Sequence, residues 1–162
     1  MQYIKIDSSS HVLYKAFEEF YSVSFPVFEQ RIETQQEYAF SRNNYHLIGW
    51  HSERHLIGFI SYWEFKEYLY IEHFAVNTGI RGKGYGTKIL NAFIESTPKI
   101  VLLEIDPITD EISKARSHKH PAYRDEYQSH SLIILTTKRV ISEQEYLDFS
   151  NDLNKCVMIL EV

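Results

Sequence analysis

The chain has very few of the residues that mark secreted, metal-binding or membrane proteins. It carries one cysteine, Cys156, so no intrachain disulfide can form, and we expect this side chain to be a small buried hydrophobe rather than a nucleophile. No stretch is apolar for long enough to span a bilayer, and residues 1–7 lack both the apolar core of a signal peptide and a transit-peptide composition. We therefore expect a soluble, cytoplasmic protein with no membrane partner.

Positive charge is also scarce. The 17 Lys and Arg residues against 22 Asp and Glu give a net charge of −5, which argues against nonspecific binding to nucleic acid. His118, His120 and His130 could hold a metal, but the lone cysteine is distant and no helical H-E-x-x-H motif accompanies them. We expect a polar loop there and no metal. With 162 residues and 44% apolar content, the chain predicts one globular domain over 1–162.

The apolar patterns along the chain predict a mixed α/β fold. An antiparallel meander is expected first, because 45–51, 55–65 and 68–76 are strand-like and joined by short polar turns. A helix over 84–96 then leads to a continuously apolar strand over 100–105, which should run parallel to the last meander strand. The other expected elements are strands over 2–6 and 131–138 and helices over 10–21, 31–41, 110–117 and 142–156, the last with a capping box of Ser142 and Glu145.

Glycine is rare except in one place. Four of the 6 glycines lie within residues 79–86, between a strand-like pattern and an amphipathic helix pattern. Glycine can adopt positive φ and allows close approach of a ligand to the backbone. A strand, a glycine-rich turn with cations and a helix N-terminus together form an anion site, because free backbone N–H groups and the helix dipole both favour negative charge. The segment predicts a phosphate-binding turn.

Two familiar phosphate motifs do not fit this turn. The dinucleotide fingerprint G-x-G-x-x-G fails because Thr87 occupies the third glycine position, and the turn follows a meander rather than the first strand of a doubly wound sheet. A Walker A loop fails because Tyr85 and Gly86 stand where Lys and Ser or Thr are required. A turn without a ligand would explain the glycines, but not the cations Arg81 and Lys83 between them.

The motif that does fit is R-x-x-G-x-G, formed by Arg81, Gly84 and Gly86 at the start of a helix. Here the chain resembles the GNAT superfamily of N-acetyltransferases. The resemblance includes the preceding strand 70–76, the following strand that ends at 103–106, and the order of elements over about residues 1–106. It implies an α/β (α+β) fold with a mixed, mostly antiparallel twisted sheet of about six to seven strands, flanked by helices and splayed between the fourth and fifth strands.

The resemblance also implies acetyl-CoA as a co-substrate, with no metal. Its pyrophosphate would lie over the glycine turn, and its pantetheine arm would pair with the edge of the fourth strand like an added strand. An N–H near Val76 could polarise the thioester carbonyl. Mapped onto this chain, the cofactor-binding residues are Phe74, Ala75, Val76, Arg81, Gly82, Lys83, Gly84, Gly86 and Thr87.

The implied reaction is direct attack of a neutral amine on the thioester, so a base must first remove the ammonium proton. Glu72 is the first candidate base, because it lies on the fourth strand next to the pantetheine-binding stretch. Strand alternation would place His73 on the opposite face, so that only one of the two could point into the substrate site. Glu104 and Asp106 share a face of the next strand, where they either accept a substrate ammonium or mark its solvated end.

One family element is missing from the sequence. The family usually has a Phe-Tyr or Leu-Tyr pair and a Gly-Phe turn after the fifth strand, and its Tyr commonly protonates the thiolate. No such pair follows Arg116, and Tyr123 is the nearest later tyrosine. The resemblance implies transfer to a primary amine of a small molecule or peptide. An acyl-CoA-binding protein without turnover and a nucleotide-binding or interaction module remain alternatives, and a homodimer remains open.

Overall fold

The computed structural model describes residues 1–53, 55–80, 82–105, 125–129 and 132–157. Its strands form one seven-stranded sheet in the order β1-β2-β3-β4-β5-β7-β6. The strands are β1 (Gln2–Lys5), β2 (Tyr45–Ser52), β3 (His55–Glu64), β4 (Tyr68–Val76), β5 (Ile100–Ile105), β6 (Asp125–Ser129) and β7 (Leu132–Thr136). The helices are α1 (Tyr14–Ser24), α2 (Glu33–Ser41), α3 (Tyr85–Glu95) and α5 (Glu143–Val157), with short 3-10 turns η1 (Val27–Glu29) and η2 (Thr78–Ile80).

The sheet is mixed and mostly antiparallel, as predicted. β1 to β4 form an antiparallel meander, and β4 and β5 form a parallel pair because α3 carries the chain back across the sheet. β5 and β6 each pair antiparallel with β7. The edge strand β6 was not predicted, since its polar residues lack the alternation by which an edge strand is recognised.

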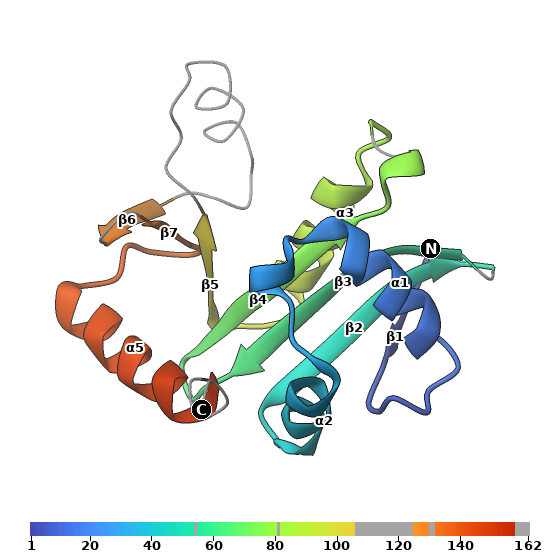
Figure 1. The fold of residues 1–162 in the computed structure, drawn as a ribbon. Coiled ribbons are helices and arrows are strands. Elements are labelled where there is room, and N and C mark those ends of the chain that lie inside the picture. The colour runs from blue at the N-terminus through green and yellow to red at the C-terminus, as the bar shows by residue number, and fades with distance from the viewer. Residues whose placement is uncertain (54, 81, 106–124, 130–131, 158–162) are drawn as a thin grey trace.

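Helices cover both faces of the sheet (Figure 1). One face packs against α1 and α2, where Phe17, Ala39 and Phe59 lie in a common core. The other face packs against α3 through Ile89 and Phe93. A third cluster joins Phe149 of α5 to Ile100 and Leu102 of β5. In the described part of the chain, no helix has the length and apolar character needed to cross a bilayer.

Two predicted helix ends can be checked. The capping box of α5 is confirmed, because Glu145 N–H donates to Ser142 Oγ (3.1 Å) and Ser142 N–H donates to Glu145 Oε1 (3.1 Å). The first helix was placed too early at 10–21: the structure has α1 at Tyr14–Ser24, with no side-chain cap. The expected helix over 110–117 lies outside the described residues.

β4 is irregular in the middle, and this irregularity positions the candidate site. Ser61 of β3 is opposite His73, but the next residue, Tyr62, is opposite Ile71. Glu72 is therefore an extra residue in β4, which defines a β-bulge. The pairing of β4 with β5 also stops here, at Ile71 and Leu103, so the two strands diverge after the bulge, as the predicted splay requires.

Candidate functional site

The glycine-rich turn has the backbone conformation that its sequence predicts. Gly82 has φ of 88° and Gly84 has φ of 77°, both in the left-handed region that other residues rarely adopt. A Cβ atom at either position would meet no atom within 4 Å, so conformation rather than space requires glycine here. Lys83 between them is exposed, and Arg81 lies outside the described residues.

The N-terminus of α3 presents backbone N–H groups without an acid to cap them. Lys88 N–H makes the first helical hydrogen bond, to Gly84 O (3.1 Å), so the amides of Tyr85, Gly86 and Thr87 precede it. No acidic residue lies in this first turn, and no side chain caps it among the described residues. By contrast, α5 begins with two acidic residues and a full capping box. The start of α3 is therefore suited to an external anion.

This turn lies against the end of β4. A Cβ atom on Gly86 would be 3.5 Å from Val76 Cγ2 and 4.0 Å from Phe74 Cζ. Asn77 N–H donates to Ile57 O (2.8 Å), and this bond sets the alternation of the β3–β4 ladder. Counting back along β4, the backbone groups of Ala75 point to β3, whereas those of Phe74 and Val76 point to the side from which β5 has diverged.

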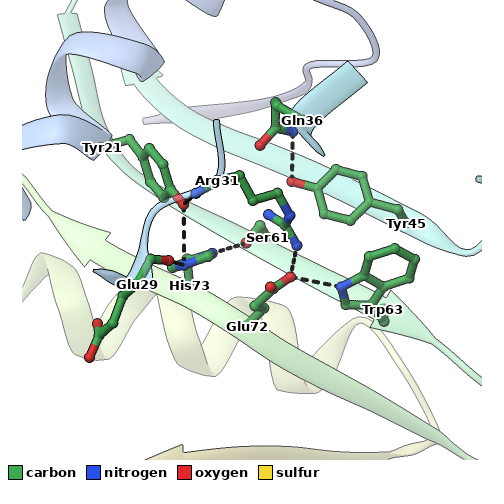
Figure 2. A network of polar contacts seen from close by, with 9 residues as sticks. All are labelled: Tyr21, Glu29, Arg31, Gln36, Tyr45, Ser61, Trp63, Glu72 and His73. Carbon is green, nitrogen blue, oxygen red and sulfur yellow. Dashed lines mark hydrogen bonds and ion pairs between the residues drawn. The ribbon is translucent and has the colours of Figure 1, made fainter. Parts of the chain in front are cut away.

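The prediction that Glu72 and His73 lie on opposite faces is wrong. The bulge at Glu72 shifts the alternation by one residue, so both side chains lie on the face covered by α1 and α2 (Figure 2). Both contact the segment 26–32, which connects α1 to α2 and which we call the strap. The structure thus places both residues on one face, whereas the sequence analysis expected only one of them to point into the substrate site.

Glu72 is held in place by two side chains from other elements. Its Oε2 accepts hydrogen bonds from Arg31 Nη2 of the strap and from Trp63 Nε1 of β3 (2.7 Å). The ion pair with Arg31 is largely shielded, with 8% of the Arg31 side chain and 16% of the Glu72 side chain exposed. The Arg31 guanidinium also lies over the rings of Tyr45 (5.0 Å) and Trp63 (6.0 Å).

His73 is a buried connector between β3, β4 and the strap. Its Nε2 lies 3.1 Å from Glu29 O, and because a carbonyl only accepts, Nε2 carries the proton and donates. Nδ1 then accepts from Ser61 Oγ (3.2 Å). Burial, aided by the Arg31 charge, lowers the pKa of His73 to about 4. The imidazole is therefore neutral at pH 7 and suits a positioning role.

Other predicted site residues are less well placed by the structure. Glu104 lies on β5 just beyond the last residue paired with β4, opposite Ile134 of β7. Asp106 and Tyr123 lie outside the described residues, as do the histidines at 118, 120 and 130. Within the described ranges, no three His, Cys, Asp or Glu residues form a group that could hold a metal.

Sequence reasoning missed Arg31, Tyr21, Tyr45 and Trp63. Arg31 is 41 residues from Glu72 in the chain, and nothing in the local sequence of the strap predicts their contact. Arg31 is anchored twice, since its backbone N–H also donates to Tyr21 Oη (2.9 Å). The only available signal was that Arg31 is the one basic residue of the strap, which is insufficient to name its partner.

Comparison with known proteins agrees with this geometry. Residues 11–107 match the model of the acetyltransferase (GNAT) family. A GNAT-family protein from Bacteroides thetaiotaomicron is 26% identical over 97% of this chain and 98% of its own, with a TM-score of 0.79. None of the curated proteins matches the chain.

Two more distant structures share the fold and were solved with coenzyme A or acetyl-CoA bound to them. A PaiA N-acetyltransferase from Thermoplasma acidophilum in complex with coenzyme A is 14% identical, covers 86% of this chain and 100% of its own, and has a TM-score of 0.60. A GNAT acetyltransferase from Elizabethkingia anophelis with acetyl-CoA bound is 10% identical, with coverages of 85% and 97% and a TM-score of 0.56. The family match spans more than half of the chain, and the chain therefore belongs to the GNAT acetyltransferase family.

Proposed function

We propose that this protein is an acetyl-CoA-dependent N-acetyltransferase that transfers the acetyl group to a primary amine by direct attack in a ternary complex. One observation carries the proposal: the backbone groups of Phe74 and Val76 face the open side of β4, next to the uncapped N-terminus of α3. A strand edge beside an anion-binding helix start matches a long ligand with an amide-bearing arm and a pyrophosphate. Structures of the same fold bind coenzyme A or acetyl-CoA.

The chain offers a complete set of groups for this ligand. The amides of Gly82, Gly84, Gly86 and Thr87 would hold the pyrophosphate, and Arg81 and Lys83 would supply positive charge. Phe74 and Val76 would pair with the pantetheine arm through their backbones. Ala75 directs its backbone to β3, so it would contribute its side chain to the lining.

Acetyl transfer also needs a group that accepts the ammonium proton of the acceptor. We assign this role to Glu72, since its Oε2 is held by Arg31 and Trp63 while its Oε1 has no hydrogen-bond partner within the described part of the chain. Oε1 can therefore receive a proton, directly or through water. Glu104 as an ammonium partner and Tyr123 as the acid for the thiolate rest on the family resemblance alone.

The test is calorimetric titration with acetyl-CoA, with Gly86→Glu compared with Gly86→Gln. The two side chains have nearly the same shape, and a Cβ at this position makes only ordinary contacts. A carboxylate at a helix N-terminus favours the helix, so weaker binding would not come from unfolding. We expect Gly86→Glu to weaken binding by about tenfold or more relative to Gly86→Gln, through repulsion of the pyrophosphate.

Other outcomes separate the alternatives. Equal affinities of the two variants for acetyl-CoA would show that its pyrophosphate does not bind at the start of α3. Saturable binding without release of free thiol against a broad amine panel would favour the acyl-CoA-binding protein without turnover. Binding of ATP but not of coenzyme A would favour the nucleotide-binding module.

A further inference from the structure

We propose that the acceptor is an amino acid or a similar small molecule with a carboxylate close to its amine, and that Arg31 and Glu72 bind these two groups. This inference rests on the proposed function and names its substrate class. It is carried by the shielded pair of opposite charges beside the open edge of β4.

Arg31 has hydrogen-bonding capacity that the described part of the chain does not use. A guanidinium carries five N–H donors, yet within the described ranges only Nη2 has an acceptor, the Glu72 carboxylate. No buried side-chain nitrogen or oxygen among the described residues is sealed from solvent without a partner, so the remaining donors can be reached from outside. A side chain that is only 8% exposed and still offers free donors is an anion receptor that a planar carboxylate fits well.

The aromatic neighbours fix the direction of these donors. The guanidinium lies over the Tyr45 ring and near the Trp63 ring, and the Tyr45 hydroxyl is itself held by Gln36 Nε2 (3.1 Å). The backbone of Arg31 is tied to Tyr21. Figure 2 shows the Arg31 guanidinium among Glu72, Tyr45 and Trp63. The cation therefore has little freedom to follow a ligand, and its open donors form a preformed site rather than an adaptable one.

Glu72 provides the complementary half of the site. Its Oε1, which has no hydrogen-bond partner among the described residues, can accept an N–H from an ammonium or amine. Glu72 also immediately precedes the stretch at which β4 becomes open. An acceptor amine held here would lie beside the open edge where we place the thioester. A carboxylate a few bonds away on the same molecule would then be within reach of Arg31.

The sign of the charges favours this class over simple amines. An ammonium bound at Glu72 also lies close to the Arg31 cation, which repels it. A carboxylate on the same acceptor converts this repulsion into attraction. The pair is electrically neutral as a unit, as is an amino acid zwitterion, so binding such a molecule leaves no buried charge uncompensated.

The experiment measures thiol release from acetyl-CoA with the twenty amino acids and with their decarboxylated amines and amides. We expect kcat/KM to be about tenfold or more higher for the preferred amino acid than for its decarboxylated amine, as for a charge-assisted contact. Arg31→Gln should remove this preference by raising KM for the amino acid while KM for the amine changes little. Arg31→Lys, which keeps the charge but not the planar fork, should restore it only partly.

Several results would overturn the inference. One such result is a kcat/KM for amines without a carboxylate that equals the value for amino acids. Another is an equal loss of rate for both classes in Arg31→Gln, which would show that Arg31 acts only by positioning Glu72. Acetyl-CoA binding without turnover of any amino acid would also reject this substrate class. Failure of the wild-type protein to bind acetyl-CoA would instead reject the proposed function itself. Unchanged acetyl-CoA affinity in Arg31→Gln would show that this variant is folded.

Discussion

His73 makes the stability of this protein depend on pH in a defined direction. The imidazole is 5% exposed, lies near the Arg31 cation and has a pKa lowered to about 4 in the folded state, against 6.5 for the free side chain. Between these two values the unfolded chain binds a proton that the folded chain excludes. The free energy of unfolding therefore falls as the pH drops from about 6.5 to about 4, and this contribution is constant above and below that window.

The size of the effect follows from the difference between the two pKa values. About 1.4 kcal/mol for each pKa unit gives about 3 kcal/mol lost between pH 7 and pH 4. The physical cause is burial, which disfavours the charged imidazole, together with the nearby guanidinium. In a protein of this size, a loss of about 3 kcal/mol corresponds to a decrease in Tm of about 6–12 °C.

The assay is urea denaturation of the wild type and of His73→Gln at several pH values between 7 and 4. The variant is expected to be less stable at pH 7 but to lose about 3 kcal/mol less than the wild type on acidification. His55→Gln is the matched control, because His55 is exposed at the start of β3 and should leave the wild-type profile unchanged. Parallel profiles for the wild type and His73→Gln would refute the assignment of a buried, neutral imidazole.

Three further predictions concern β3, β4 and the strap. Glu72→Gln should lower kcat by about 10²-fold or more while KM for acetyl-CoA changes little, and wild-type turnover would remove Glu72 from the mechanism. A double-mutant cycle of Arg31→Gln and Glu72→Gln, measured by urea denaturation, tests the ion pair. We expect each single change to lower the free energy of unfolding by about 2–3 kcal/mol, with a coupling energy of about 1–2 kcal/mol between the two. Additive losses would show that the ion pair does not form. Gly58→Ala should destabilise the protein by about 1–3 kcal/mol in the same assay, because its Cβ would lie 2.8 Å from Ala75 O, and an unchanged midpoint would contradict this close approach.

Much of the framework is encoded locally and could be predicted. The strands of the meander show apolar runs joined by short polar turns, and the crossover length between β4 and β5 requires a parallel pair. Gly82 and Gly84 mark positive φ because no other residue adopts it as readily, and their spacing before an amphipathic helix indicates an anion-binding turn. The capping box of α5 depends on only two residues three positions apart.

The bulge at Glu72 could not be predicted, and it changed the interpretation of the site. A strand pattern is read with a period of two, and one extra residue reverses every later assignment of faces without leaving a local signature. Whether a bulge forms depends on the register with β3, that is, on how residues 58–64 align with 69–76. The polar edge strand β6 was missed for a related reason, since it is held by backbone pairing with β7 rather than by an apolar face.

The amino-acid sequence was enough to indicate the family and the order of the elements from β1 to β5, because each of these depends on residues that are close together in the chain. It also predicts an anion-binding turn, for the same reason. Only the tertiary structure decided that Glu72 and His73 share a face, and that Arg31 from a distant strap pairs with Glu72 between two aromatic rings. The physical reason is that a shielded ion pair is stable only where packing excludes water around both partners. That enclosure is formed by the strap together with strands β2, β3 and β4, and Arg31 of the strap lies 41 residues before Glu72 in the chain.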